Sequence, residues 1–203
     1  PSFVAGAATA DSDEQGRAIV DTILALSGST VASYWASSLL EAENKFRPVD
    51  IQNATLAGGV AIGAIANLNI GPFDAVITGV AAGIISTYGF NVIQPYLEIN
   101  IGLHDSCGIH NLHAIPSVIG ALASVVVQGY KSTQDGLEDQ WWRQLAAMFL
   151  CMAFSIVTGL ITGFFLRFLQ VNEEEHDIKQ FRDSAWWEVA NDFGTSYYSE
   201  LAR

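Results

Sequence analysis

The stretch LAAMFLCMAFSIVTGLITGFF, residues 145–165, decides the fold class of this chain. It contains no charged residue, and it is as long as the run of about 20 apolar residues that a helix needs to cross a bilayer. Further nearly uncharged runs recur along the chain, while acidic residues gather in short connectors and near the C-terminus. The sequence therefore predicts an all-α membrane protein, a polytopic bundle of transmembrane helices.

The composition of the 203 residues fits a chain that meets two solvents. Half of the residues are hydrophobic and 15% are charged, whereas soluble globular domains have about 25% charged residues. The formal net charge is −12, with nine basic residues scattered along the chain. Because phosphate backbones are bound by clustered Lys and Arg side chains, nucleic acid is excluded as a partner. The partner that this composition predicts is the lipid bilayer.

Five full spans are expected from the apolar runs, preceded at Pro1-Ser2-Phe3 by the end of another helix. The chain has no initial methionine, so we expect it to be part of a longer sequence. Residues 1–170 would form the transmembrane domain, and residues 171–203 a solvent-exposed tail. The five spans are expected at about residues 17–40, 51–70, 73–93, 106–128 and 141–169, with a very tight turn at Gly71-Pro72.

The placement of Lys and Arg predicts the orientation of these spans, since cytoplasmic connectors carry an excess of both. When connectors are assigned alternately to the two sides, six basic residues lie on one side and three on the other. We therefore expect the connector at 41–50 and the C-terminus in the cytoplasm. The six are Lys45, Arg47, Arg167, Lys179, Arg182 and Arg203, and the three are Arg17, Lys131 and Arg143.

Small residues recur at helix spacing within the expected spans. Membrane helices associate through close backbone contact at such residues, because apolar side chains gain little by leaving lipid. We interpret these residues as packing sites rather than functional ones. The GxxxG pairs are Gly59 with Gly63, Gly79 with Gly83, and Gly159 with Gly163.

The stretch HDSCGIHNLHAIP, residues 104–116, opens the fourth expected span and holds three of the four histidines. Ionisable groups inside a membrane are costly and usually face the bundle interior or an aqueous path. His110 and His113 would share one face of an α-helix, with His113 about seven residues, or roughly 10 Å, into it. Pro116 has no N–H for the Leu112 carbonyl, which loosens the helix beside His113.

The residues by themselves leave several roles open for this stretch. A metal site from His104, Asp105, His110 and His113 has suitable ligand types but lacks the spacing of known zinc enzymes. Another interpretation is that the histidines are satisfied side chains that pack the bundle. A membrane hydrolase would need a nucleophile–base–orienter motif, which the stretch does not show. Asp105 precedes the helix and is suited to cap its free N–H groups.

Several stretches, in order along the chain, are similar to signatures of one family, the Rh glycoproteins. This resemblance to the Rh branch of the ammonium transporter family extends along the whole chain. It implies the second half of an 11-helix transporter fold, assembled as a homotrimer or an Rh heterotrimer, with no cofactor. The stretches are PSF at 1–3, IQNATLAGGVA at 51–61, HDSCG at 104–108, HNLH at 110–113 and WWEV at 186–189.

The resemblance also implies roles for single residues. His113 resembles one of two facing histidines that line the family's pore, and His110 would be its neighbour in the pore or a packing residue. Asp105 matches a buried carboxylate near the inner end of that helix. Phe3 matches one of two stacked rings that gate the outer mouth.

The function implied by this resemblance is ammonium transport across the plasma membrane rather than an enzymatic reaction. Ammonium would shed its proton so that neutral ammonia passes, since dehydrating a cation in an apolar pore is very costly. Imidazole titrates near neutral pH, and its two nitrogens can accept and donate hydrogen bonds. The alternatives are a non-conducting Rh-like structural subunit and conduction of carbon dioxide.

Overall fold

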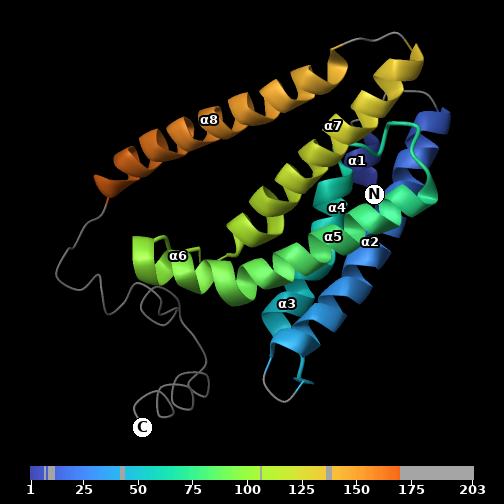
Figure 1. Ribbon diagram of the computed structural model, residues 1–203. Coiled ribbons are helices and arrows are strands. Elements are labelled where there is room, and N and C mark those ends of the chain that lie inside the picture. Colours follow the sequence, from blue (N-terminus) through green and yellow to red (C-terminus); the bar gives the residue numbers. More distant parts are fainter. Residues whose placement is uncertain (7, 9–11, 42–43, 106, 136–138, 170–203) are drawn as a thin grey trace. The chain divides into compact units, whose positions relative to one another are not determined.

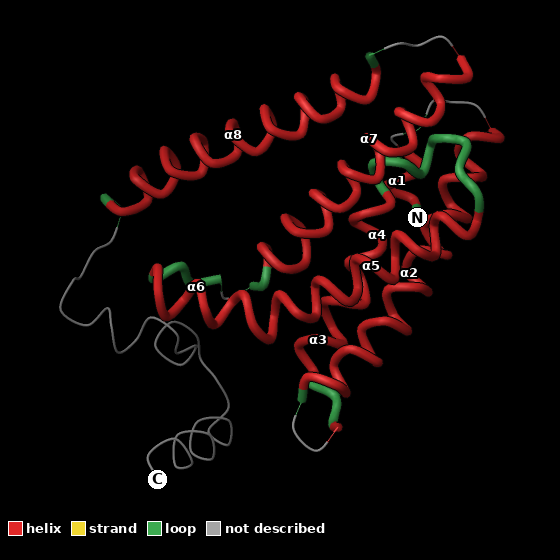
Figure 2. The backbone as a smooth tube through the Cα atoms, viewed as in Figure 1, coloured by secondary structure: helices red, strands yellow, loops and turns green. Residues whose placement is uncertain are grey.

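The computed structural model is helical, with no strand in the part of the chain that it describes (Figures 1 and 2). It describes residues 1–169 except 7, 9–11, 42–43, 106 and 136–138, so the expected tail at 171–203 lies outside the described residues. The helices are α1 (Ser2–Gly6), α2 (Ser12–Leu40), α3 (Pro48–Asn53), the 3-10 turn η2 (Ala54–Leu56), α4 (Ala57–Ile62), α5 (Pro72–Tyr88), the π-helix η3 (Gly89–Ile93), α6 (Gln94–Ile101), the π-helix η4 (His110–Ala114), α7 (Ile115–Asp135) and α8 (Gln140–Arg167).

Four helical stretches are long and apolar enough to cross a membrane, which agrees with four of the five expected spans. The stretch that contains α5 is longer than expected, because α5, η3 and α6 follow one another without a break. Within the described residues the all-α membrane class is confirmed. The four stretches are Asp13–Leu40, Pro72–Ile101, His110–Tyr130 and Gln140–Arg167.

The expected span at residues 51–70 is wrong as a single helix. The helix that starts with α3 ends at Ile62, and residues 63–70 form turns before α5 begins. The expected tight turn at Gly71-Pro72 is instead the start of α5, where the Asp74 carboxylate accepts the Gly71 N–H at 2.9 Å. Ala57, Gly58, Ala61 and Ile62 of α4 are buried, and a broken helix is tolerated in a membrane where protein covers it.

The GxxxG pair of α5 is a packing site, as expected. α5 packs along α2, and a Cβ on Gly79 would overlap the backbone of Ala25. A Cβ on Gly83 would lie 2.6 Å from the Ser29 carbonyl oxygen. Gly159 of α8, by contrast, has no neighbouring atom within 4 Å of such a Cβ among the described residues. The absence of side chains on α5 thus brings two membrane helices into backbone contact.

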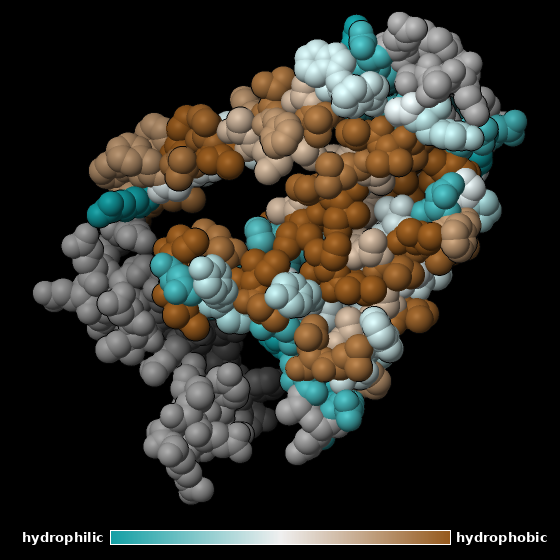
Figure 3. All heavy atoms as spheres, in the orientation of Figure 1, coloured by the Kyte–Doolittle hydropathy of each residue, from teal (hydrophilic) through white to brown (hydrophobic). Residues whose placement is uncertain are grey.

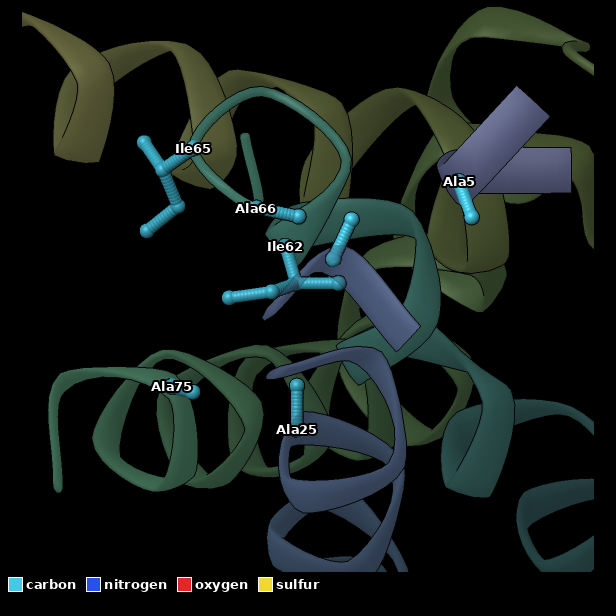
Figure 4. Close-up of a cluster of buried hydrophobic side chains, with 7 residues drawn as sticks. Ala5, Ala25, Ile62, Ile65, Ala66 and Ala75 are labelled. Carbon is cyan, nitrogen blue, oxygen red and sulfur yellow. The ribbon is translucent and has the colours of Figure 1, made fainter. Parts of the chain in front are cut away.

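The core of residues 1–152 consists largely of small side chains. Ala25 of α2, Ile62 of α4 and Ala75 of α5 belong to one buried cluster (Figure 4). Large apolar side chains are exposed instead, such as Ile99 at 82% and Val126 at 71%, and hydrophobic residues cover much of α5, α7 and α8 in Figure 3. This distribution is typical of helices that meet lipid, where large apolar side chains gain little by burial.

The structure divides into two units, residues 1–152 and 153–203, with the boundary inside α8. The described part of the second unit is the C-terminal portion of α8. There the ring of Phe164 packs edge-on against Phe165 and Phe168, with centroid distances of 5.9 and 5.0 Å.

Candidate functional site

Asp105 caps the helix that carries the histidines. Its Oδ1 accepts the Ile109 N–H at 2.9 Å, and its Oδ2 accepts the His110 N–H at 2.8 Å. The first N–H groups of a helix have no partner within it, and the positive end of the helix dipole favours a carboxylate there. The capping role expected for Asp105 is therefore observed, while the role implied by the family resemblance stays a prediction.

The helix that carries His113 starts later than expected, and its first turn, η4, is π-helical. It begins at Ile109, so His113 lies about four residues, or roughly 6 Å at about 1.5 Å per residue, into it. The Ile115 N–H donates to the His110 carbonyl, five residues back. Because a π-turn is wider than an α-turn, the α-helical spacing on which the expectation of a shared face rested is absent here, and a common direction of His110 and His113 stays a prediction.

The two histidine rings have different surroundings. The ring of His110 is half-buried, and its Nδ1 lies 3.2 Å from the Asn111 Oδ1. His113 is exposed, and no hydrogen bond reaches its ring from the residues that the structure describes. Within the part of the protein that the structure describes, the His113 ring is therefore not engaged by another side chain.

Asn111, between the two histidines, is a residue that the sequence analysis missed. Its side chain is fully buried. The Asn111 Nδ2 donates to the Gln94 Oε1 at 2.8 Å, and the Gln94 Nε2 donates to the Asp105 carbonyl at 2.8 Å. A Cβ on Gly89 would lie 2.6 Å from the Asn111 Oδ1, so only glycine leaves room for this amide. The signal in the sequence that could have identified Asn111 is the presence of an amide side chain within an apolar span.

The π-helix η4 leaves one backbone carbonyl, that of Asn111, without a hydrogen-bond donor from its own helix. After the bond from Ile115 to His110, the same ladder would continue with a bond from residue 116 to the Asn111 carbonyl. Pro116 has no N–H. The Ser86 hydroxyl donates to this carbonyl instead, at 2.8 Å.

The π-helix η3, on the neighbouring span, repeats this arrangement. The Gln94 N–H donates to the Gly89 carbonyl, five residues back. The next residue is Pro95, which has no N–H for the Phe90 carbonyl. The Arg47 Nη1 lies 3.4 Å from the Phe90 carbonyl oxygen and provides a long hydrogen bond. Both π-helices therefore depend on a side chain from elsewhere in the fold.

A buried polar cluster joins the α2–α3 connector to η3. The Asp50 side chain is fully buried, and its Oδ2 accepts the Ser37 hydroxyl at 2.8 Å and the Asn91 Nδ2 at 2.9 Å. The Arg47 Nη1 donates to the Asn91 Oδ1 at 3.0 Å. Since a buried carboxylate is costly unless it is paired, we interpret this cluster as a structural anchor of η3.

Phe3 lies apart from this segment in the sequence and on a different element. It belongs to α1, which packs against α2, and its side chain is 91% exposed. Its role as a gate therefore stays a prediction.

The described residues contain no group of three His, Cys, Asp or Glu side chains placed to hold a metal ion.

Comparison with known proteins identifies the family of this chain. The model of the Ammonium Transporter Family matches residues 1–185. The chain is 42% identical to the ammonium transporter Rh type A of Bos taurus over 190 residues, which cover 93% of this chain and 43% of that protein. It is 35% identical to the ammonium transporter Rh type C of Rattus norvegicus, with 98% of this chain and 44% of that protein covered.

A solved structure of an Rh protein has the same fold as this chain. The structure titled "Nitrosomonas europaea Rh50 and mechanism of conduction by Rhesus protein family of channels" matches with a TM-score of 0.80 and 30% identity. The match covers 100% of this chain and 49% of that one. The chain thus spans less than half the length of each of these three proteins. It belongs to the ammonium transporter family, and the relatives named here are of the Rh type.

Proposed function

We propose that this chain contributes to a membrane channel of the Rh type that conducts ammonia, and that the protein is a transporter rather than an enzyme. Ammonium gives its proton to water at the mouth of the pore, and neutral ammonia passes His113. The names of the Rh-type relatives and of the Rh50 structure support ammonium or ammonia as the substrate. In this proposal Phe3 gates the outer mouth and Asp105 supports the helix of His113.

The observation that carries the proposal is the environment of His113. The other polar side chains around η4 are engaged: Asp105 caps the helix, Asn111 bonds Gln94, and Ser86 bonds a carbonyl. His113 is exposed on a membrane-spanning stretch, and no hydrogen bond reaches its ring from the described residues. An ionisable group in a membrane usually faces a partner or an aqueous path, and a neutral imidazole can both accept and donate a proton.

The test of this function is transport by the full-length protein in lipid vesicles. An inward ammonium gradient should raise the internal pH faster than in protein-free vesicles, because entering ammonia takes up a proton. A rate equal to that of protein-free vesicles would favour the non-conducting structural subunit. The other alternative, conduction of carbon dioxide, is tested by imposing a carbon dioxide gradient on the same vesicles. It predicts faster internal acidification than in protein-free vesicles.

The proposed placement is the plasma membrane, as a homotrimer or an Rh heterotrimer with its C-terminus in the cytoplasm. Six of the nine basic residues lie on the side assigned to the cytoplasm, in agreement with the excess of Lys and Arg on that side of membrane proteins. A C-terminal tag should then resist external protease in intact cells. Cleavage of the tag without permeabilisation would contradict this orientation.

A further inference from the structure

We propose that Asn111 is a positioning residue, which holds the π-helical turn η4, and with it the ring of His113, in the conformation used for transport. It does so together with Gln94 and Ser86 of the neighbouring span. This inference rests on the proposed function, because Asn111 acts on transport only through His113.

The first argument is the burial and bonding of the Asn111 amide. A buried amide without hydrogen bonds is costly, and this one is fully buried. Its Nδ2 donates to the Gln94 Oε1 at 2.8 Å, and its Oδ1 lies 3.2 Å from the His110 Nδ1. The missing side chain of Gly89 leaves the space in which the Oδ1 lies. Both ends of the amide are thereby engaged by neighbours.

The second argument concerns what the π-turn would otherwise become. In an α-helix the Ile115 N–H would bond the Asn111 carbonyl, four residues back, rather than the His110 carbonyl. The Ser86 hydroxyl occupies this carbonyl at 2.8 Å and so favours the π-helical pairing. Pro116 adds no competing N–H.

The third argument is the effect of such a change on His113. Conversion of η4 to an α-helix removes one residue from the wide turn. The residues before the conversion then rotate by about 100° relative to those after it, the angle per residue of an α-helix with 3.6 residues per turn. Since π-turns occur frequently at functional sites, the geometry points to η4 as the feature that sets the direction of the His113 ring. Asn111 and Ser86 are the contacts that keep it.

The first measurement is the rate at which a cysteine at position 113 reacts with a thiol reagent. This rate depends on the position of the side chain and does not require transport. In the full-length protein with Cys107 and Cys151 replaced by serine, His113→Cys is labelled with a small water-soluble thiol reagent. Adding Asn111→Leu, or the smaller change Ser86→Ala, should alter the labelling rate by about fivefold or more, because each change removes a buried hydrogen bond of η4. Asn100→Leu is the matched control, since Asn100 is exposed and, among the described residues, its side chain bonds the Tyr96 carbonyl of its own helix and no other group.

The second measurement is ammonium flux per folded protein in vesicles, with His113 intact. Asn111→Leu and Ser86→Ala should lower it on the order of tenfold, as misplacement of a functional group typically does, and Asn100→Leu should leave it unchanged. An unchanged labelling rate in both variants overturns the inference, as does an altered rate with unchanged flux. Ser86→Ala keeps the test valid if Asn111→Leu does not fold.

The two proposals fail in different ways. If His113→Ala transports ammonium like the wild type, the proposed pore role of His113 is wrong, and the role of Asn111 in transport is wrong with it. If His113→Ala is impaired while Asn111→Leu and Ser86→Ala are not, only the positioning inference is wrong.

Discussion

Replacing His113 with alanine in the full-length protein should lower ammonium flux by a factor on the order of a hundred, the contribution typical of a positioned proton-transfer group. His113 lies on a membrane-spanning stretch, and no hydrogen bond reaches its ring from the described residues. Removing the imidazole should also change how flux varies with pH, because the proposed pore then lacks a side chain that accepts and donates protons. The measurements are internal alkalinisation and ammonium-driven current in vesicles, at several pH values.

His113→Glu extends this test, since it replaces a group that can be neutral with a carboxylate. We expect a change in the charge carried per molecule, because a negative side chain stabilises a cation in the pore. His104→Ala is the matched control. His104 lies in the loop before the helix, where its Nδ1 is 3.1 Å from the Glu98 Oε1 and both side chains are about half exposed. Unchanged flux, pH profile and charge per molecule in both His113 variants would reject the pore role.

Replacing Gly79 with valine should prevent α2 and α5 from packing, with a loss of stability of about 3 kcal/mol or more. Even a Cβ at this position overlaps the backbone of Ala25, and a backbone cannot move aside as a flexible side chain can. Relief therefore requires separation of the two helices along the contact that holds this part of the protein together. The measurements are the yield of monodisperse protein in detergent and the midpoint of its thermal unfolding.

The matched control for this substitution is Gly16→Val in α2, the helix that Gly79 contacts. A Cβ at Gly16 has no neighbour within 4 Å among the described residues. We expect a small change in the unfolding midpoint for Gly16→Val and a large one for Gly79→Val. Equal changes in the two variants would show that the close approach of α2 and α5 is not the cause.

The sequence determined the fold class, the family and most of the spans. Hydrophobic length is a local property, so the uncharged run at 145–165 indicates a membrane helix without reference to its neighbours. The cap at Asp105 was also predictable, because its bonds reach only the N–H groups of Ile109 and His110. The signature at 104–113 pointed to the Rh-type relatives, because short motifs in the same order are a property of the chain alone.

The tertiary structure alone decided where helices break and that η4 is a π-helix rather than an α-helix. An apolar run at 51–70 does not reveal that α4 ends at Ile62, because the break depends on burial by other helices. The hydroxyl that bonds the Asn111 carbonyl of the π-turn belongs to Ser86, 25 residues earlier in the sequence. Hydrogen bonds between distant residues leave no periodic pattern, which is why the sequence suggested an α-helical turn at His110 and His113 where the folded chain has a π-turn.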